Sequence, residues 1–274
     1  MRIDAHQHFW KFDPIQHEWI TEKMEAIRKD FVPEDLQSLL YENQIDGCVA
    51  VQVDQSENET KALLQLAGQN AFIKGVVGWV DLMSPDIRER LNHFVRHKKI
   101  KGFRHISQGQ PEGFLLQKDF LRGIGSLKEF GFTYDILIFP NQLPEAISLV
   151  RQFPDQRFVL DHMAKPLIKK GILEPWKKDI SELASYENVY CKLSGMVTEA
   201  DWENWSADNF KPYLDVVLNS FGTRRVCYGS DWPVCLVASS YQRQLAIVEE
   251  YIGRLSFDEK KDIMGENAIQ FYNL

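Results

Sequence analysis

The sequence has no uninterrupted apolar run of the roughly 18 residues that a membrane-spanning helix requires. Its first six residues, Met1–His6, include an arginine, an aspartate and a histidine where a signal peptide would have an apolar core. Positive charge is also scarce, because 32 lysines and arginines stand against 39 aspartates and glutamates, for a net charge of −7. This balance argues against nucleic acid or an anionic membrane surface as the main partner.

Cysteine is rare, and its spacing excludes the usual thiolate zinc motifs. The four cysteines form no CxxC pair, and three of them lie in apolar runs: Cys48, Cys191, Cys227 and Cys235. Buried thiols in a reducing compartment are typical of this pattern, so we expect neither a disulfide nor a zinc–thiolate site. The sequence therefore predicts a soluble cytoplasmic protein, and it does not distinguish a monomer from a homo-oligomer.

No low-complexity segment or Pro/Gly/Ser-rich linker divides the 274 residues. The composition, 44% hydrophobic, 26% charged and 12% aromatic, is that of an ordinary globular protein. We therefore expect one domain over residues 1–274.

Short β-branched runs alternate with segments of helical period along the whole chain. One predicted helix begins near Ser84 and Pro85, and a capping box at Ser256–Glu259 predicts another near the end. The predicted strands are Arg2–Ala5, Gly47–Val53, Ile73–Val80, Ile100–Arg104, Thr133–Ile138, Arg157–Leu160, Val189–Leu193 and Arg225–Tyr228. Eight strand–helix repeats in one chain of this length predict an α/β fold, a single (β/α)₈ TIM-like barrel. An open doubly wound sheet is the alternative, but no glycine-rich nucleotide motif follows any strand.

Polar and aromatic residues collect where the predicted strands end, which is where a barrel of this type carries its function. In chain order these residues are His6, His8, Gln52, Asp54, Trp79, Asp81, Arg104, His105, Asp161, His162, Ser194 and Asp231. The other three histidines, His17, His93 and His97, are expected in solvent.

His6 and His8 are two residues apart on one strand, so their side chains point to the same face. Two imidazoles at the mouth of a barrel suit a single metal ion, and His162 and Asp231 would complete a His/Asp set for zinc or a similar divalent ion. An HxH pair alone is equally compatible with a structural role. Its combination with a histidine after the sixth strand and an aspartate after the eighth is more specific.

Six sequence blocks, in order, resemble a known family. They are Met1–Trp10 (MRIDAHQHFW), Gly75–Asp81 (GVVGWVD), Lys101–His105 (KGFRH), Leu160–Pro166 (LDHMAKP), Tyr228–Pro233 (YGSDWP) and Met264–Ala268 (MGENA). These blocks are similar to the amidohydrolase superfamily, and more narrowly to its amidohydrolase 2 branch of sugar lactonases of the L-fuconolactonase and L-rhamnonolactonase type. The resemblance extends over nearly the whole chain, from Arg2 to about Tyr272.

The resemblance implies a TIM-like barrel that hydrolyses esters or amides with an activated water. His6 and His8 match the family's metal-binding HxH, His162 its sixth-strand histidine and Asp231 its eighth-strand general base. The chain departs from the wider superfamily because its fifth strand offers no histidine and no lysine ends its fourth strand. This departure argues against two metals and leaves one ion or none.

The predicted reaction is the opening of a sugar-acid lactone such as an L-fucono- or L-rhamnono-lactone. Attack on its carbonyl requires a base and a group that stabilises the oxyanion. Asp231 is the expected base, and without a metal His105, His162 and Arg104 would stabilise the oxyanion. The leaving oxygen would take its proton from His162 or from bulk water. The residues expected to contact the sugar are Trp79, Trp10, Trp232, Gln52, Asp54 and Arg104.

Two other functions fit the same residues. One is a metal-dependent decarboxylase of the same superfamily, and the other is a non-catalytic barrel that binds a sugar acid. Asp161 is expected to be structural, because it precedes His162 and would point to the opposite face of the strand. Lys165 either orients the substrate or only pairs with a carboxylate. Ser194 lacks a GxSxG elbow, so a serine hydrolase is not expected.

Overall fold

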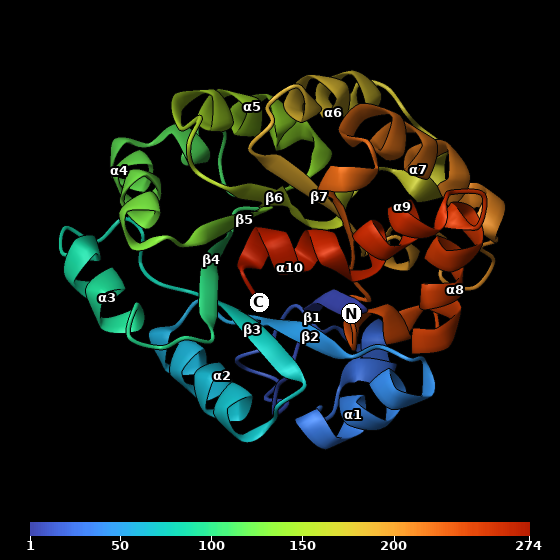
Figure 1. Cartoon of the computed structure of the whole chain (residues 1–274), viewed down its shortest axis with the longest axis horizontal. Coiled ribbons are helices and arrows are strands. Elements are labelled where there is room, and N and C mark those ends of the chain that lie inside the picture. Colours follow the sequence, from blue (N-terminus) through green and yellow to red (C-terminus); the bar gives the residue numbers. More distant parts are fainter.

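The computed structural model describes all 274 residues and forms a barrel of eight parallel strands surrounded by helices (Figure 1). Neighbours along the chain are neighbours in the sheet, in the order β1 to β8. The strands are β1 (Ile3–Gln7), β2 (Gly47–Val51), β3 (Ile73–Gly78), β4 (Ile100–Ile106), β5 (Thr133–Leu137), β6 (Phe158–Leu160), β7 (Val189–Leu193) and β8 (Val226–Tyr228). The predicted fold class and all eight predicted strands are confirmed.

The barrel is closed by contacts between β1 and the segment that follows β8. Gln7 and Trp232 form a parallel bridge, and the His8 N–H donates to the Trp232 carbonyl at 2.7 Å. The Asp231 N–H donates to the His6 carbonyl at 2.8 Å. The first and last motifs of the sequence therefore lie side by side.

Ten helices lie outside the strands or at the end of the barrel. They are α1 (Pro33–Glu42), α2 (Glu57–Gln69), α3 (Ile87–Phe94), α4 (Lys118–Leu127), α5 (Leu143–Gln152), α6 (Trp176–Ala184), α7 (Ala207–Phe221), α8 (Tyr241–Ile252), α9 (Phe257–Lys261) and α10 (Asn267–Tyr272). None of these helices is both long and apolar enough to cross a bilayer.

Two predicted helix starts have different outcomes. The capping box is confirmed, because the Ser256 hydroxyl accepts the Glu259 N–H at the start of α9. The prediction for Ser84 is wrong, since α3 begins at Ile87 and the Ser84 hydroxyl bonds the Asp86 carboxylate instead. The hydroxyl donates to that carboxylate, and Asp86 rather than Ser84 precedes the first residue of α3.

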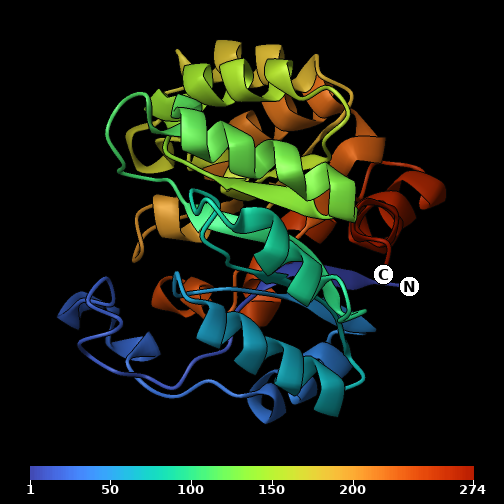
Figure 2. The same ribbon diagram turned by 90° about the vertical axis from the view of Figure 1, so that its left-hand side faces the viewer.

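The core has two parts. Most buried apolar side chains lie between the sheet and the surrounding helices, while a smaller cluster fills the barrel and includes Phe271 and Tyr272 of α10. Helix α10 lies across one end of the barrel, beside both termini (Figure 1), and Figure 2 shows the segment after β1 projecting at the opposite end. The amino-terminal end is thus covered, and the carboxyl ends of the strands are left to form a site.

Candidate active site

A pocket of about 200 Å³ lies at the carboxyl ends of the strands. One of its walls is polar and includes His8, Arg104, His162 and Asp231. The remaining lining residues are Trp19, Val53, Ile106, Gln108, Leu137, Lys165 and Val234. Four of the residues predicted for the site therefore share one cavity.

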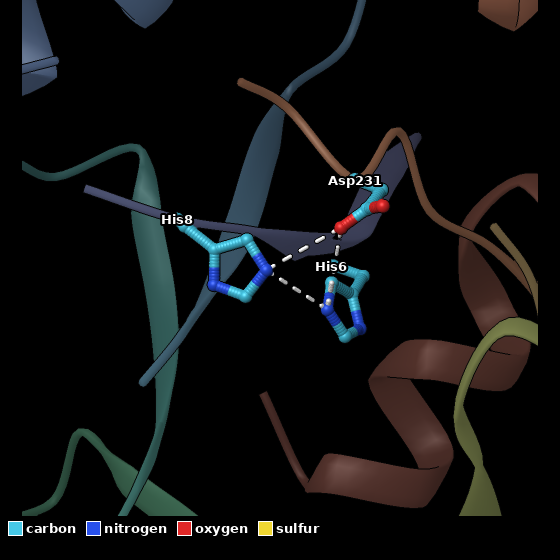
Figure 3. Close-up of side chains that lie close together, drawn as sticks. All are labelled: His6, His8 and Asp231. Carbon is cyan, nitrogen blue, oxygen red and sulfur yellow. Dashed lines mark hydrogen bonds and ion pairs between the residues drawn. The ribbon is translucent and has the colours of Figure 1, made fainter. Parts of the chain in front are cut away.

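His6, His8 and Asp231 converge beneath this pocket (Figure 3). His6 Nε2 lies 3.2 Å from His8 Nε2, and Asp231 Oδ1 lies 3.4 Å from His8 Nε2 and 3.8 Å from His6 Nε2. Both imidazoles come from the β1 segment, where residues two apart share a face. The barrel closure brings the carboxylate to them.

The proton of the His8 ring points away from His6 and Asp231. His8 Nδ1 lies 2.8 Å from the Val51 carbonyl, an acceptor only, so Nδ1 carries the proton and Nε2 keeps a lone pair. Burial lowers the pKa of His8 and lowers that of His6 well below its ordinary value, which keeps both rings neutral. A lone pair of His8 Nε2 and one of Asp231 Oδ1 therefore face the same point as His6 Nε2.

That donor set fits one divalent cation. Ligand atoms at about 2.0–2.1 Å from a tetrahedral zinc lie about 3.3 Å apart, close to the 3.2 and 3.4 Å separations at His8. A second group, formed by His6, Asp161 and His162, also has ligand atoms close together. There, however, the Lys192 ammonium lies 2.9 Å from Asp161 Oδ1 and competes with a metal ion for that oxygen.

His162 joins the site through an unusual backbone segment. His162, Met163, Ala164 and Lys165 all have φ between 50° and 57°, the left-handed region that non-glycine residues rarely adopt. This turn places His162 Nδ1 2.8 Å from the Ser194 hydroxyl and Nε2 3.9 Å from Asp231 Oδ1. Burial lowers the pKa of His162 to about 4, so the ring is neutral near pH 7.

Asp231 is also in the left-handed region, with φ of 57°. Burial alone would raise the pKa of its carboxyl, but nearby His162 and contact with His8 lower it below the ordinary value. Asp231 is therefore a carboxylate at neutral pH.

Arg104 forms part of the polar wall and is held almost completely by protein groups. Its Nε and Nη2 donate to Gln52 Oε1 at 3.1 and 2.8 Å, and Nη2 also bonds the Gln52 carbonyl. Nη1 donates to Asp161 Oδ2 at 3.0 Å and lies 3.2 Å from His6 Nε2. Gln52, predicted to bind substrate, is thus fully buried as the partner of Arg104.

His105 and Trp79 lie outside the pocket. Because His105 follows Arg104 in β4, its side chain points away from the barrel interior and stacks on Phe114, with ring centroids 5.1 Å apart. Its Nδ1 accepts the Trp79 indole N–H at 3.3 Å. The structure does not bring these two residues to His6, His8 and Asp231.

Trp10 and Asp54 line a separate pocket of about 430 Å³ between the β1 loop and α2. His17, expected in solvent, is only 2% exposed there, so that expectation is wrong. Its ring stacks on Phe12, and its Nε2 lies 3.8 Å from Asp54 Oδ1. Trp232 is buried against Phe9 and Phe31 and supports the loop of Asp231.

The sequence reasoning missed two pocket residues that can contact a ligand, and a buried charged group. Trp19 is the tryptophan that lines the pocket, and Gln108 lines it with an amide oxygen that has no hydrogen-bond partner. Below the pocket, Lys192 is fully buried with Asp135 and Asp161. The signal in the sequence that could have identified Lys192 is its charge inside the otherwise mostly apolar strand Val189–Leu193 (VYCKL).

Comparison with known proteins places the chain in a family. The amidohydrolase family model matches residues 3–274. The chain belongs to the amidohydrolase family. A curated relative from Burkholderia multivorans, named L-fucono-1,5-lactonase, is 37% identical over 100% of this chain and 96% of its own length.

Solved structures of other amidohydrolases share the fold. An amidohydrolase from Burkholderia multivorans with bound zinc has a TM-score of 0.97 and 37% identity, covering 100% of this chain and 99% of that chain. A 2,6-dihydroxybenzoate decarboxylase has a TM-score of 0.69 and 12% identity, covering 100% of this chain and 99% of its own. The latter likeness concerns the fold alone.

Proposed function

We propose that this protein hydrolyses the ring ester of a sugar-acid lactone, with L-fucono-1,5-lactone as the first substrate to test. The observation that carries the proposal is the convergence of His6, His8 and Asp231 at the floor of a pocket also lined by Arg104 and His162. The name of the full-length relative from Burkholderia multivorans supports the choice of substrate class. The distant decarboxylase adds no argument for decarboxylation, since it shares only the fold.

We propose that His6, His8 and Asp231 hold one divalent ion, with zinc favoured by the ligand types and by its presence in a related structure. The chemistry that such an ion supplies is to lower the pKa of water and to polarise a carbonyl oxygen. Asp231, whose pKa is lowered, is a weak base for free water. A metal ion that lowers the pKa of water would therefore compensate for the weak basicity of Asp231.

The remaining residues of the polar wall have distinct roles in this proposal. Asp231 takes the proton of the attacking water. His162, neutral and fixed by Ser194, donates a hydrogen bond to the developing oxyanion or passes a proton to the leaving ring oxygen. Arg104 contributes positive charge, because its N–H groups are already directed at Gln52, Asp161 and His6.

The other wall of the pocket suits a sugar ring. Trp19, whose side chain is 43% exposed, offers an aromatic face, and Lys165 and Gln108 offer polar groups to hydroxyls. Lys165 has no carboxylate within ion-pair distance, which favours a role in substrate binding over a structural ion pair. We propose these three residues as the sugar-binding wall.

We also propose that the protein works in the cytoplasm. All four cysteines are buried and unpaired, as expected of a protein from a reducing compartment.

Proton release measured with a pH indicator tests the proposed function. The purified protein is mixed with 1,4- and 1,5-lactones of five- and six-carbon aldonic acids, including L-fucono-1,5-lactone. We expect one stereochemical series to open much faster than in buffer, and Asp231→Asn to open it at least about 100-fold more slowly than the unmodified protein. If no lactone in the panel opens faster than spontaneously, the proposal fails.

A further inference from the structure

A fully buried lysine lies directly beneath the proposed metal ligands. Lys192, in the middle of β7, has no exposed surface. Its Nζ lies 2.6 Å from Asp135 Oδ2, 2.9 Å from Asp161 Oδ1 and 3.1 Å from His6 Nδ1. Burying an ammonium group is costly unless it is paired, and here two carboxylates pair with it.

Asp161 contacts Lys192, Arg104 and His6. Its Oδ2 accepts from Arg104 Nη1 at 3.0 Å, and its Oδ1 lies 3.3 Å from His6 Nδ1. A proton on His6 Nδ1 would give this oxygen a second donor beside the Lys192 ammonium.

The protein groups around His6 could favour either of its two tautomers. Lys192 and Arg104 are both donors, one beside Nδ1 and the other beside Nε2, whereas a neutral imidazole has only one acceptor nitrogen. Asp161 is an acceptor and lies on the Nδ1 side. If Lys192 donates to the two carboxylates, Nδ1 keeps its proton and Nε2 keeps the lone pair that faces His8 and Asp231.

We propose that Asp161, held by Lys192 and Arg104, is a positioning residue that fixes the proton of His6 on Nδ1 and thereby keeps Nε2 available to a divalent ion. The inference rests on the metal site of the proposed function. It also replaces the expectation that Asp161 faces away from the site, because the left-handed turn at His162 lets both neighbours reach the barrel interior. A carboxylate behind a metal-binding histidine commonly increases metal affinity 10- to 100-fold.

The charges of this group are balanced within the barrel. Asp135 and Asp161 carry two negative charges, and Lys192 and Arg104 carry two positive ones. The group therefore adds no net charge beneath the ligands. Its effect on a metal ion comes from the orientation of His6.

Zinc affinity, measured by competition with a chromophoric chelator, tests this proposal without reference to catalysis. We expect Asp161→Asn to weaken zinc binding about 10- to 100-fold. We also expect it to change the visible spectrum of the cobalt-loaded protein. Asp135→Asn is the matched control, because Asp135 pairs with the same lysine but does not contact His6. We expect that variant to bind zinc within about threefold of the unmodified protein.

Several outcomes would overturn the inference. It is wrong if folded Asp161→Asn binds zinc as the unmodified protein does, if Asp135→Asn weakens binding equally, or if the unmodified protein binds no zinc. Should Asp161→Asn not fold, Asp161→Ser provides the same test, because it also removes the carboxylate beside His6 Nδ1. A protein that binds zinc through this network but opens no lactone would contradict the proposed function and leave the inference standing.

Discussion

The Asp231 main chain donates to the His6 carbonyl at 2.8 Å, while its side-chain Oδ1 faces His6 Nε2 at 3.8 Å. One contact closes the barrel, and the other completes the group of atoms that we propose to hold a divalent ion. The geometry of the site therefore depends on closure of the sheet.

Replacing Asp231 by asparagine keeps the shape of the side chain and removes its charge. We expect kcat to fall about 10²–10⁴-fold, the usual contribution of a general base. Steady-state kinetics on the best lactone of the panel measures this. Asp81→Asn is the control, since Asp81 follows β3 but does not line the pocket. Retention of more than a tenth of the activity by Asp231→Asn would exclude it as the base.

Gly195 supports His162 from behind. A Cβ at this position would lie 2.6 Å from His162 Nδ1, and its φ of +64° also disfavours other residues. Gly195→Ala is expected to displace the imidazole and lower kcat at least 10-fold. Gly171 has the same φ of +64° but no atom within 4 Å of an added Cβ.

Gly171→Ala therefore imposes the same backbone cost, about 1–2 kcal/mol, without touching the site. Thermal unfolding should show destabilisation in both variants, larger in Gly195→Ala because its Cβ also meets the His162 ring, with activity lost only in Gly195→Ala. Equal activities in the two variants would show that the position of His162 does not matter.

Because His105 is largely buried, we expect the stability of the protein to depend on pH. Burial lowers its pKa to about 4, whereas an unfolded histidine takes up its proton near pH 6.5. Between these values the unfolded state binds more protons, so the free energy of unfolding falls as the pH falls from about 6.5 to 4. His105→Phe, which preserves stacking on Phe114, should make this dependence weaker.

Urea unfolding of the metal-free protein at several pH values measures the effect. The exposed His93, changed to phenylalanine, is the control and should leave the slope unaltered. An unchanged slope in His105→Phe would mean that this histidine is protonated as readily in the fold as in the unfolded chain.

Trp19 is expected to contribute to substrate binding by stacking. Covering about 40–80 Å² of the indole face is worth about 1–2 kcal/mol, so Trp19→Ala should raise KM about 5- to 30-fold with a smaller change in kcat. Trp19→Phe keeps an aromatic face, so its KM should stay close to that of the unmodified protein. Tyr41→Ala, at an 87% exposed aromatic residue far from the pocket lining, should have no effect. A normal KM in Trp19→Ala would remove it from the sugar-binding wall.

The fold could be predicted because its signals are local. Apolar runs such as Gly47–Val51 indicate strands buried on both faces, and their alternation with amphipathic helices indicates a parallel barrel. The pairing of His6 with His8 needed only the two-residue period of a strand. The motif order then assigned Asp231 and His162 to the same end of the barrel.

The substrate-facing wall could not be predicted in the same way. Being near a strand end does not give the direction of a side chain, which is why Arg104 lies in the pocket and the adjacent His105 does not. Trp10 and Trp19 belong to one loop, and its path places only Trp19 against the pocket. That path depends on packing of the short helix Glu22–Ile27 against Val234–Val237, more than 200 residues away.

The sequence by itself determined the barrel and the family resemblance, because periodicity and motif order are properties of the chain. It also identified four residues that the structure brings together: His6, His8, His162 and Asp231. Only the tertiary structure decided which polar groups share the pocket and that Lys192 and Arg104 balance the charges of Asp135 and Asp161 beneath it. The physical reason is that burial and charge pairing join residues from different strands, and no local pattern records the partner of a buried charge.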